Sequence, residues 1–195
     1  MRATWPVSAL VLEYRNPERT IVCVQSLIDD GVRDVLVVDN SDDGGATWKI
    51  LKGALDGMPA VACYRAKTNL GFAAGVNLGL GMLRAERVIV INNDAVVSDG
   101  AVAALSTAID EDKEAVVAFP KLIHCGRVME EVHYNRWTGT LSSRPGIGKF
   151  GVPRGCCMLV ARDRLGAGPL FDEDFFMYGE EIELGWRIRR LGLRM

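Results

Sequence analysis

The stretch VLVVDNSDDGG, residues 35–45, joins four apolar β-forming residues to a cluster of acids, an amide, a hydroxyl and two glycines. A near-continuous run of Val and Leu is typical of a strand that is buried on both faces of a parallel sheet. In open α/β sheets, ligands bind outside the carboxyl ends of the strands. Asp39, Asn40 and Ser41 are therefore predicted to border a ligand site. An Asx turn, in which Asp39 and Ser41 hold only their own loop, is an equally weighted alternative.

Around this stretch, apolar strands alternate with amphipathic segments of about 10–15 residues. The predicted strands are residues 7–14, 34–39, 60–65, 87–92, 115–120 and 156–162. The predicted helices run from Asn16 to Gly31, over 47–55 and 71–84, from a cap at Ser98 or Asp99 to about Glu111, and over 180–191. This order indicates an α/β fold with a mostly parallel central sheet and helices on both faces. Residues 121–154 are rich in Gly, Arg and aromatics and are predicted to be irregular.

Composition narrows the class of protein. The 195 residues carry a formal net charge of −2 and are 49% hydrophobic, which suits one domain over residues 1–195. This charge balance argues against nucleic acid as a partner. No stretch reaches the roughly 18 apolar residues of a membrane span, and the start is interpreted as a strand rather than a signal peptide. Five cysteines without a Cys-x-x-Cys pair argue against a zinc site or a disulfide framework, so we expect Cys156 and Cys157 to be small packing residues and the protein to be cytoplasmic.

Two further acidic clusters follow predicted elements. Asn92, Asn93 and Asp94 end an apolar strand, and their hard oxygens could bind Mg²⁺ or Mn²⁺ together with a diphosphate; the alternative is a polar turn. Glu180 and Glu181 open the last predicted helix directly after the aromatic stretch FFMYG. Aromatic neighbours would raise the pKa of a carboxylate and suit it to act as a general base. The alternative is that the acids favour the helix start and the aromatics are core.

Gly71, Gly75 and Gly79 recur at every fourth residue of a predicted helix. This spacing makes one bare helix face, and we expect close packing on the sheet at Gly75 and Gly79. Gly71 lies near the helix start, where free amide groups favour anions. The segment is neither a P-loop nor a dinucleotide fingerprint.

Taken in order, these stretches resemble the family-2 glycosyltransferases with the GT-A fold, and in particular their rhamnosyltransferase-like branch. The stretches that carry the resemblance are LVLEYRNPE, VLVVDNSDDGG, NLGFAAGVNLGL, VIVINNDAVV, RGCCMLVAR and FDEDFFMYGEEIELGWRIRRLG. The resemblance implies a GT-A domain in which residues 1–120 bind a nucleotide sugar and residues 121–195 bind the acceptor and carry the base. Because family members typically continue beyond such a last helix, we expect the chain to be a truncated form.

The resemblance also implies an activity, which is transfer of a sugar from a nucleotide diphosphate sugar with inversion at the anomeric carbon. Asp94 matches the metal-binding acid for Mg²⁺ or Mn²⁺, and Glu181 matches the catalytic base, with Glu180 beside it. The family usually has Asp at the positions of Glu181 and Glu183. The implied nucleotide-binding residues are Glu13, Asp39, Asn40, Ser41, Asn69, Gly71, Asn92 and Asn93.

The partners implied are a dTDP-, UDP- or GDP-linked donor and a saccharide or lipid-linked acceptor, in cell-surface polysaccharide or glycolipid synthesis. dTDP-rhamnose is favoured by the branch alone. Arg154, Trp137 and Tyr178 are candidates for acceptor binding. Arg187, Arg190 and Arg194 follow helical spacing and could contact the inner face of a membrane, although a solvated basic face is the preferred interpretation. The alternatives are a nucleotide-binding domain with impaired catalysis and a sugar-nucleotide pyrophosphorylase.

Overall fold

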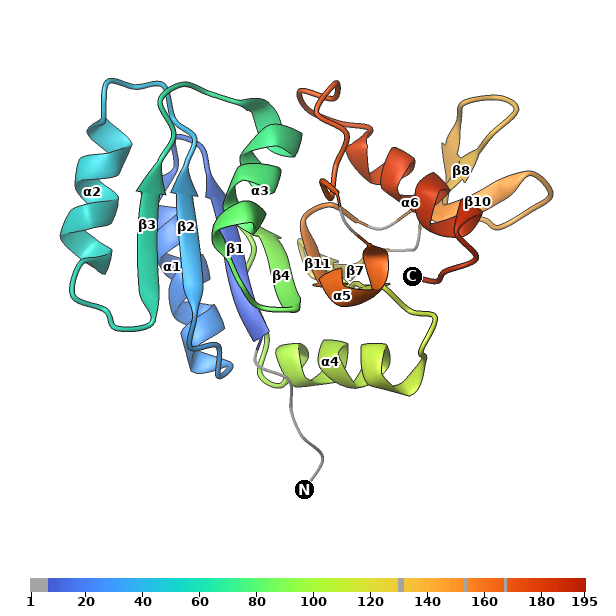
Figure 1. Ribbon diagram of the computed structural model, residues 1–195, viewed down its shortest axis with the longest axis horizontal. Helices are drawn as coiled ribbons and strands as arrows, with labels where there is room; N and C mark the ends of the chain where they lie inside the picture. Colours follow the sequence, from blue (N-terminus) through green and yellow to red (C-terminus); the bar gives the residue numbers. More distant parts are fainter. Residues whose placement is uncertain (1–6, 130–131, 153, 167) are drawn as a thin grey trace.

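The structure is a computed structural model that describes residues 7–129, 132–152, 154–166 and 168–195. A six-stranded sheet in the order β3-β2-β1-β4-β11-β5 forms its centre (Figure 1). The strands are β1 (Val7–Glu13), β2 (Val35–Asp39), β3 (Val61–Arg65), β4 (Arg87–Asn92), β5 (Val117–Ala118), β6 (Ile123–His124), β7 (Arg127–Val128), β8 (Val132–Asn135), β9 (Leu141–Ser142), β10 (Lys149–Val152) and β11 (Cys157–Ala161). The helices are α1 (Pro17–Asp29), α2 (Ala46–Leu55), α3 (Gly71–Met82), α4 (Ala101–Glu111), α5 (Arg162–Leu165) and α6 (Glu180–Arg190).

Strands β1 to β4 are mutually parallel, whereas β11 pairs antiparallel with both β4 and β5. Alternate residues of each strand face opposite sides of the sheet. One set packs against α1, α2 and α4, and the other packs against α3 and α6. The prediction of a mostly parallel sheet with helices on both faces is thus confirmed. Within the described ranges, no helix combines the length and the apolar character needed to cross a bilayer.

The glycine-bearing face of α3 lies close against the sheet, as predicted. A Cβ atom on Gly75 would lie 2.8 Å from a methyl carbon of Leu12. A Cβ atom on Gly79 would collide with one methyl carbon of Leu10 and lie 2.9 Å from the other, and it would lie 3.1 Å from a methyl carbon of Val38. Only glycine allows this helix to approach the strands so closely.

The segment 121–154, predicted to be irregular, instead contains short antiparallel pairs. Strands β6 and β7 form one ladder, and β8 pairs with both β9 and β10. Their lengths of two to four residues are too short to give a clear alternating pattern in the sequence. The fifth predicted strand, 115–120, is likewise reduced to the two residues of β5.

The start of α4 also differs from its prediction. Neither Ser98 nor Asp99 caps the helix; the N-cap residue is Gly100, which has no side chain that could cap it. The carboxylate of Asp30, just after α1, accepts hydrogen bonds from the amides of Gly100 and Val102. The capping acid therefore comes from a distant part of the chain.

Candidate active site

The carboxyl edge of the parallel strands gathers most of the predicted site residues. The strand register places Glu13 beside Asp39, Asp39 beside Arg65, and Leu12 beside Asn92. Because neighbouring strands are about 4.8 Å apart, Asp39 and Asn92 lie roughly 10 Å apart along one rim of the sheet.

Asp39 is fully buried, and its two carboxylate oxygens differ. Oδ1 accepts a hydrogen bond of 2.9 Å from the amide of Ser41, which is the Asx turn that the sequence allowed. Oδ2 has no hydrogen-bond partner among the described residues, and Nε of Arg65 lies 4.0 Å away. Ser41 is also occupied, since its hydroxyl accepts from the amide of Arg15 at 2.9 Å. One oxygen of Asp39 thus holds the loop, and the other is available for a ligand.

Asn40 is buried, and its amide is fully used within the protein. Its Nδ2 donates to Oδ1 of Asn69 at 3.1 Å and to the carbonyl of Gly71 at 3.0 Å. Its Oδ1 accepts from the amide of Leu70 at 2.9 Å. Asn40 and Asn69 therefore fix the loop before α3, and their predicted contact with a nucleotide would have to compete with these bonds.

Glu13 and Asn93 form a second internal network. The buried carboxylate of Glu13 accepts from the amide of Asn16, the hydroxyl of Thr20 and Nδ2 of Asn93, the last at 2.6 Å. Burial raises the pKa of Glu13, and the hydrogen bonds from Asn16 and Asn93 partly oppose this rise. The side chain of Asn16 makes no cap, so the carboxylate of Glu13 fixes the start of α1 in its place. Glu13 and Asn93 thus join β1, α1 and the turn after β4.

The start of α3, predicted to attract anions, is covered by protein. The amide of Gly71 donates to Oδ1 of Asn69 at 2.9 Å, and the amide of Phe72 donates to the carbonyl of Phe176 at 2.7 Å. Gly71 has φ +80°, and a Cβ atom there would collide with Phe176. The glycine thus allows the segment before α6 to pack on the start of α3.

A cavity of about 630 Å³ joins the two halves of the chain. Asn92 and Asp94, at the end of β4, line it together with Glu181 from α6. Oε2 of Glu181 is buried and has no hydrogen-bond partner within the part of the chain that the structure describes. Gly155 lies against this acid, because a Cβ atom there would be 3.6 Å from Oε1 of Glu181. Two acids that are distant in the sequence therefore share one hollow.

The oxygens of Asn92 and Asp94 fit a divalent cation that is held mainly by its substrate. Oδ1 of Asn92 is buried without a partner, whereas Asp94 is half-exposed, with Nη1 of Arg19 at 3.8 Å from its Oδ2. Among the described residues, no group of three or more His, Cys, Asp or Glu side chains could hold a metal ion. Mg²⁺ commonly uses only one or two protein carboxylates and completes its coordination with phosphates and water. The chemistry of this pair suits such an ion.

The structure brings two of the three predicted acceptor residues to the cavity. Arg154 and Tyr178 line it. Tyr178 is 81% exposed and has φ +68°, a left-handed conformation that non-glycine residues rarely adopt and that clusters at functional sites. Trp137 is not among the lining residues. It lies in the turn that joins β8 to β9, and the guanidinium carbon of Arg136 is 5.2 Å from the centre of its ring.

The two adjacent acids of α6 point to different environments. Glu181 lines the cavity, whereas Glu180 is only 4% exposed and follows the spacing of the buried Leu184 and Ile188. Burial, and secondarily the charge of Glu181, raises the pKa of Glu180. Glu181 is therefore the better placed of the two to meet a substrate.

The arginines at the end of the chain do not form one free basic face. Arg187 donates to the carbonyls of Pro169 and Leu170 and pairs with Glu183. Arg194 lies beyond the end of α6 and forms ion pairs with Asp112 and Glu114. Two of the three candidate membrane contacts are thus engaged within the protein.

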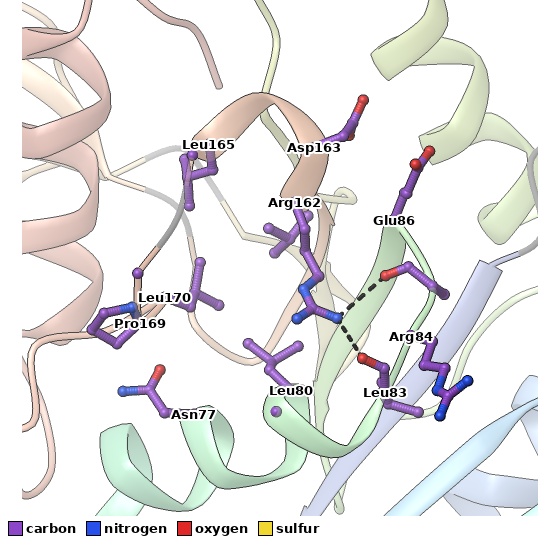
Figure 2. A pocket seen from close by; sticks show the side chains of 15 residues that line it. Asn77, Leu80, Leu83, Arg84, Glu86, Arg162, Asp163, Leu165, Pro169 and Leu170 are labelled. Atoms are coloured by element: carbon purple, nitrogen blue, oxygen red, sulfur yellow. Dashed lines mark hydrogen bonds between the residues drawn. The ribbon is translucent and has the colours of Figure 1, made fainter.

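Another cavity, of about 410 Å³, lies at the opposite edge of the sheet, between the end of α3 and α5 (Figure 2). Arg162 points into it and donates to the carbonyls of Leu83 at 2.8 Å and Ala85 at 3.3 Å (Figure 2). This guanidinium secures the chain after α3, so the cavity is explained by packing.

The sequence interpretation missed two cations at the rim. Arg65 ends β3 and lies beside Asp39, and its guanidinium is close to Gly45, where a Cβ atom would lie 2.7 Å from Nη1. The rule that drew attention to Asp39, a polar residue at the carboxyl end of a strand, also applies to Arg65. Arg19 approaches Asp94 from the exposed side of α1, and no motif signals it.

A family model and two solved structures are similar to this chain. The family model described as Glycosyl transferase family 2 matches residues 8–165. The solved structure of GalNAc-T7 with UDP, GalNAc and Mn²⁺ is similar, with a TM-score of 0.75 and 14% identity over 99% of this chain and 42% of that one. The mannosyltransferase from Pyrobaculum calidifontis with GDP-mannose and Mn²⁺ gives a TM-score of 0.72 and 16% identity over 99% of this chain and 54% of that one.

A search of curated protein sequences finds no match. The chain spans about half the length of the two structures that it resembles. At this level of identity, the structures establish the α/β fold with its GT-A-like sheet. The family model covers most of the chain, from β1 to α5. The chain therefore belongs to glycosyl transferase family 2.

Proposed function

We propose that this chain transfers a sugar from a nucleotide diphosphate sugar to an acceptor hydroxyl, with inversion at the anomeric carbon and with the help of Mg²⁺ or Mn²⁺. The observation that carries the proposal is the shared cavity of Asp94 and Glu181, with the unpartnered oxygen of Asn92 beside them. Asp39 and Arg65, further along the same rim, are the proposed contacts of the nucleoside.

In the proposed reaction, Glu181 accepts the proton of the acceptor hydroxyl as that oxygen bonds to the anomeric carbon. The bond to the diphosphate breaks, and its electron pair leaves with the nucleoside diphosphate. When bound at Asp94 and Asn92, a divalent cation would supply charge neutralisation for the departing diphosphate.

The acids of the cavity favour inversion. A retaining mechanism through a covalent intermediate needs a second carboxylate as nucleophile. Among the residues that the structure describes, the cavity lining contains two acids, Asp94 and Glu181. If Asp94 holds the cation, Glu181 is left as the base, and these described residues supply no separate carboxylate nucleophile.

The nucleobase and the sugar of the donor substrate are proposed only as a short set of candidates. The similar structures hold UDP in one case and GDP-mannose in the other, which makes UDP- and GDP-linked sugars the first donors to test. The resemblance of the sequence to the rhamnosyltransferase-like branch adds dTDP-rhamnose. The same resemblance suggests a saccharide or lipid-linked acceptor in polysaccharide or glycolipid synthesis.

The test has two parts. Thermal unfolding with UDP, dTDP and GDP, each with and without Mn²⁺, should show stabilisation that requires the metal, because a ligand of the native state raises apparent stability. Donor hydrolysis should then fall about 10²- to 10⁴-fold in Glu181→Gln, the usual contribution of a general base.

Glu111→Gln, an exposed change at the end of α4, serves as the control and should leave hydrolysis unchanged. Unchanged hydrolysis in Glu181→Gln would remove the assigned role of this acid. Nucleotide binding without any hydrolysis would instead identify a binding domain.

A further inference from the structure

A second hollow lies beside the active-site cavity, on the other side of the first turn of α6. Its volume is about 420 Å³, within the range of about 300–1,000 Å³ that is typical of small-molecule sites. Gly179 and Ile182 line both this hollow and the cavity of Glu181. A ligand could therefore extend from one space into the other.

Aromatic rings form one wall of this hollow. The ring centroids of Tyr134 and Phe150 are 5.5 Å apart, and those of Phe150 and Trp186 are 5.6 Å apart, with tilted planes. Phe150 is buried and gives this wall a fixed base, whereas Trp186 is 37% exposed. Arg136 and Glu183 add a donor and an acceptor at the edge. Apolar rings beside a few polar groups suit a sugar ring, which presents C–H groups on its faces and hydroxyls at its rim.

A smaller hollow of about 90 Å³ adjoins the aromatic one and shares Arg136, Phe150 and Trp186 with it. Lys149 and Arg189 complete its charged lining, and none of the described residues that line it is an acid. Nζ of Lys149 donates hydrogen bonds to the hydroxyl of Ser142 and to the carbonyl of Arg144, which hold its charge in place. Cations without an acid indicate a negatively charged ligand group.

Building on the proposed function, we propose that these two hollows form an acceptor subsite for an acidic saccharide. One sugar ring packs on Trp186, and its carboxylate or phosphate lies beside Arg136 and Arg189. Trp186 is five residues after Glu181 on α6, a rise of about 7.5 Å along the helix axis. The subsite would thus hold part of the acceptor close to the base that activates its hydroxyl.

The test compares two probes that differ only at C6, methyl β-glucuronide with a carboxylate and methyl β-glucoside with a hydroxymethyl group, by saturation-transfer NMR and titration calorimetry. The wild-type protein should bind the glucuronide more tightly, and the difference should shrink as salt is added. Arg189→Gln should weaken glucuronide binding about two- to fivefold, as expected for an exposed charge pair. Arg190→Gln, an exposed neighbour that lines neither hollow, should leave binding unchanged.

Trp186→Leu should weaken both probes about tenfold, because a stacked aromatic anchor is lost. Trp186→Tyr keeps a ring and should retain most of the binding, which separates loss of stacking from loss of fold. Trp48→Leu, which removes a half-buried tryptophan from α2, is the matched control.

Metal-dependent nucleotide binding and donor hydrolysis are measured on the same samples. Failure of the proposed function would appear as their absence in the wild type. If the wild type hydrolyses a donor but binds neither probe, binds both probes equally, or binds them unchanged after Trp186→Leu, the subsite assignment is wrong.

Discussion

Replacement of Asn40 with alanine tests whether this residue is a ligand contact or part of the scaffold. In the structure the side chain is 3% exposed and makes three hydrogen bonds, to Asn69, Leu70 and Gly71. Together they tie the loop after β2 to the start of α3. Asn40→Ala removes all three bonds without adding bulk.

The expected loss of stability follows from these bonds. A typical buried hydrogen bond contributes about 1 kcal/mol net, and an amide left unpaired costs about 1–3 kcal/mol. The amide of Leu70 is only partly buried, so water can replace part of its lost bond. We therefore expect Asn40→Ala to lower the free energy of unfolding by about 2–4 kcal/mol. For a chain of this size this corresponds to a fall in melting temperature of roughly 4–16 °C.

Urea unfolding measures this change, and Asn69→Ala makes the measurement specific. Because Asn40 and Asn69 share one hydrogen bond, the double variant should lose about 0.5–1.5 kcal/mol less than the sum of the single losses. A loss below about 1 kcal/mol in Asn40→Ala, together with strongly weakened nucleotide binding, would refute the structural assignment. Asn40 would then be a ligand contact, as its position in the sequence suggested.

Two further predictions concern α3 and α6. The Gly79→Ala variant should be less stable in urea than the Gly81→Ala variant by about 1–3 kcal/mol. A Cβ atom at position 79 would meet Leu10 and Val38, whereas nothing lies within 4 Å of a Cβ atom at position 81. Equal stabilities of the two variants would contradict the close packing of α3 on the sheet. Burial raises the pKa of Glu180 in the folded state above the unfolded value of about 4.3. The contribution of Glu180 to the stability of the fold is therefore complete below the unfolded pKa, and it is lost as pH rises through the folded pKa. Glu180→Gln should therefore raise the melting temperature near pH 7 and have little effect near pH 4, and the opposite pH dependence would show that the carboxylate is stabilised in its charged form.

Most of the sheet was predictable because four of its strands, β1, β2, β4 and β11, are buried along almost their whole length. Residues 87–92 were predicted as a strand and form β4 with the same limits. A strand of this kind needs apolar side chains at consecutive positions, and such a run stands out from the helices between. The two-residue strands β6, β7 and β9 are mostly exposed, so their sequence carries no comparable pattern.

The roles of individual amides were not predictable in the same way. Asn40 and Asn93 follow strand ends, as a ligand-binding residue would, yet their partners lie at Asn69 and Glu13, 29 and 80 residues away. An asparagine that holds a loop and one that binds a nucleotide can occupy the same kind of position, directly after a strand. Only the fold determines which partner it finds.

The fold shows which oxygens at the carboxyl edge of the sheet have hydrogen-bond partners and which do not. At the end of β2 and again at the end of β4, one residue is used within the protein and its neighbour keeps an unpartnered oxygen: Oδ2 of Asp39 and Oδ1 of Asn92. Glu181 adds a third buried oxygen without a partner. Each such group costs about 1–3 kcal/mol as long as no ligand or water completes it. A nucleoside at Asp39, a cation at Asn92 and an acceptor hydroxyl at Glu181 would each satisfy one of these oxygens, so the same cost that weakens the empty domain would favour binding of its substrates.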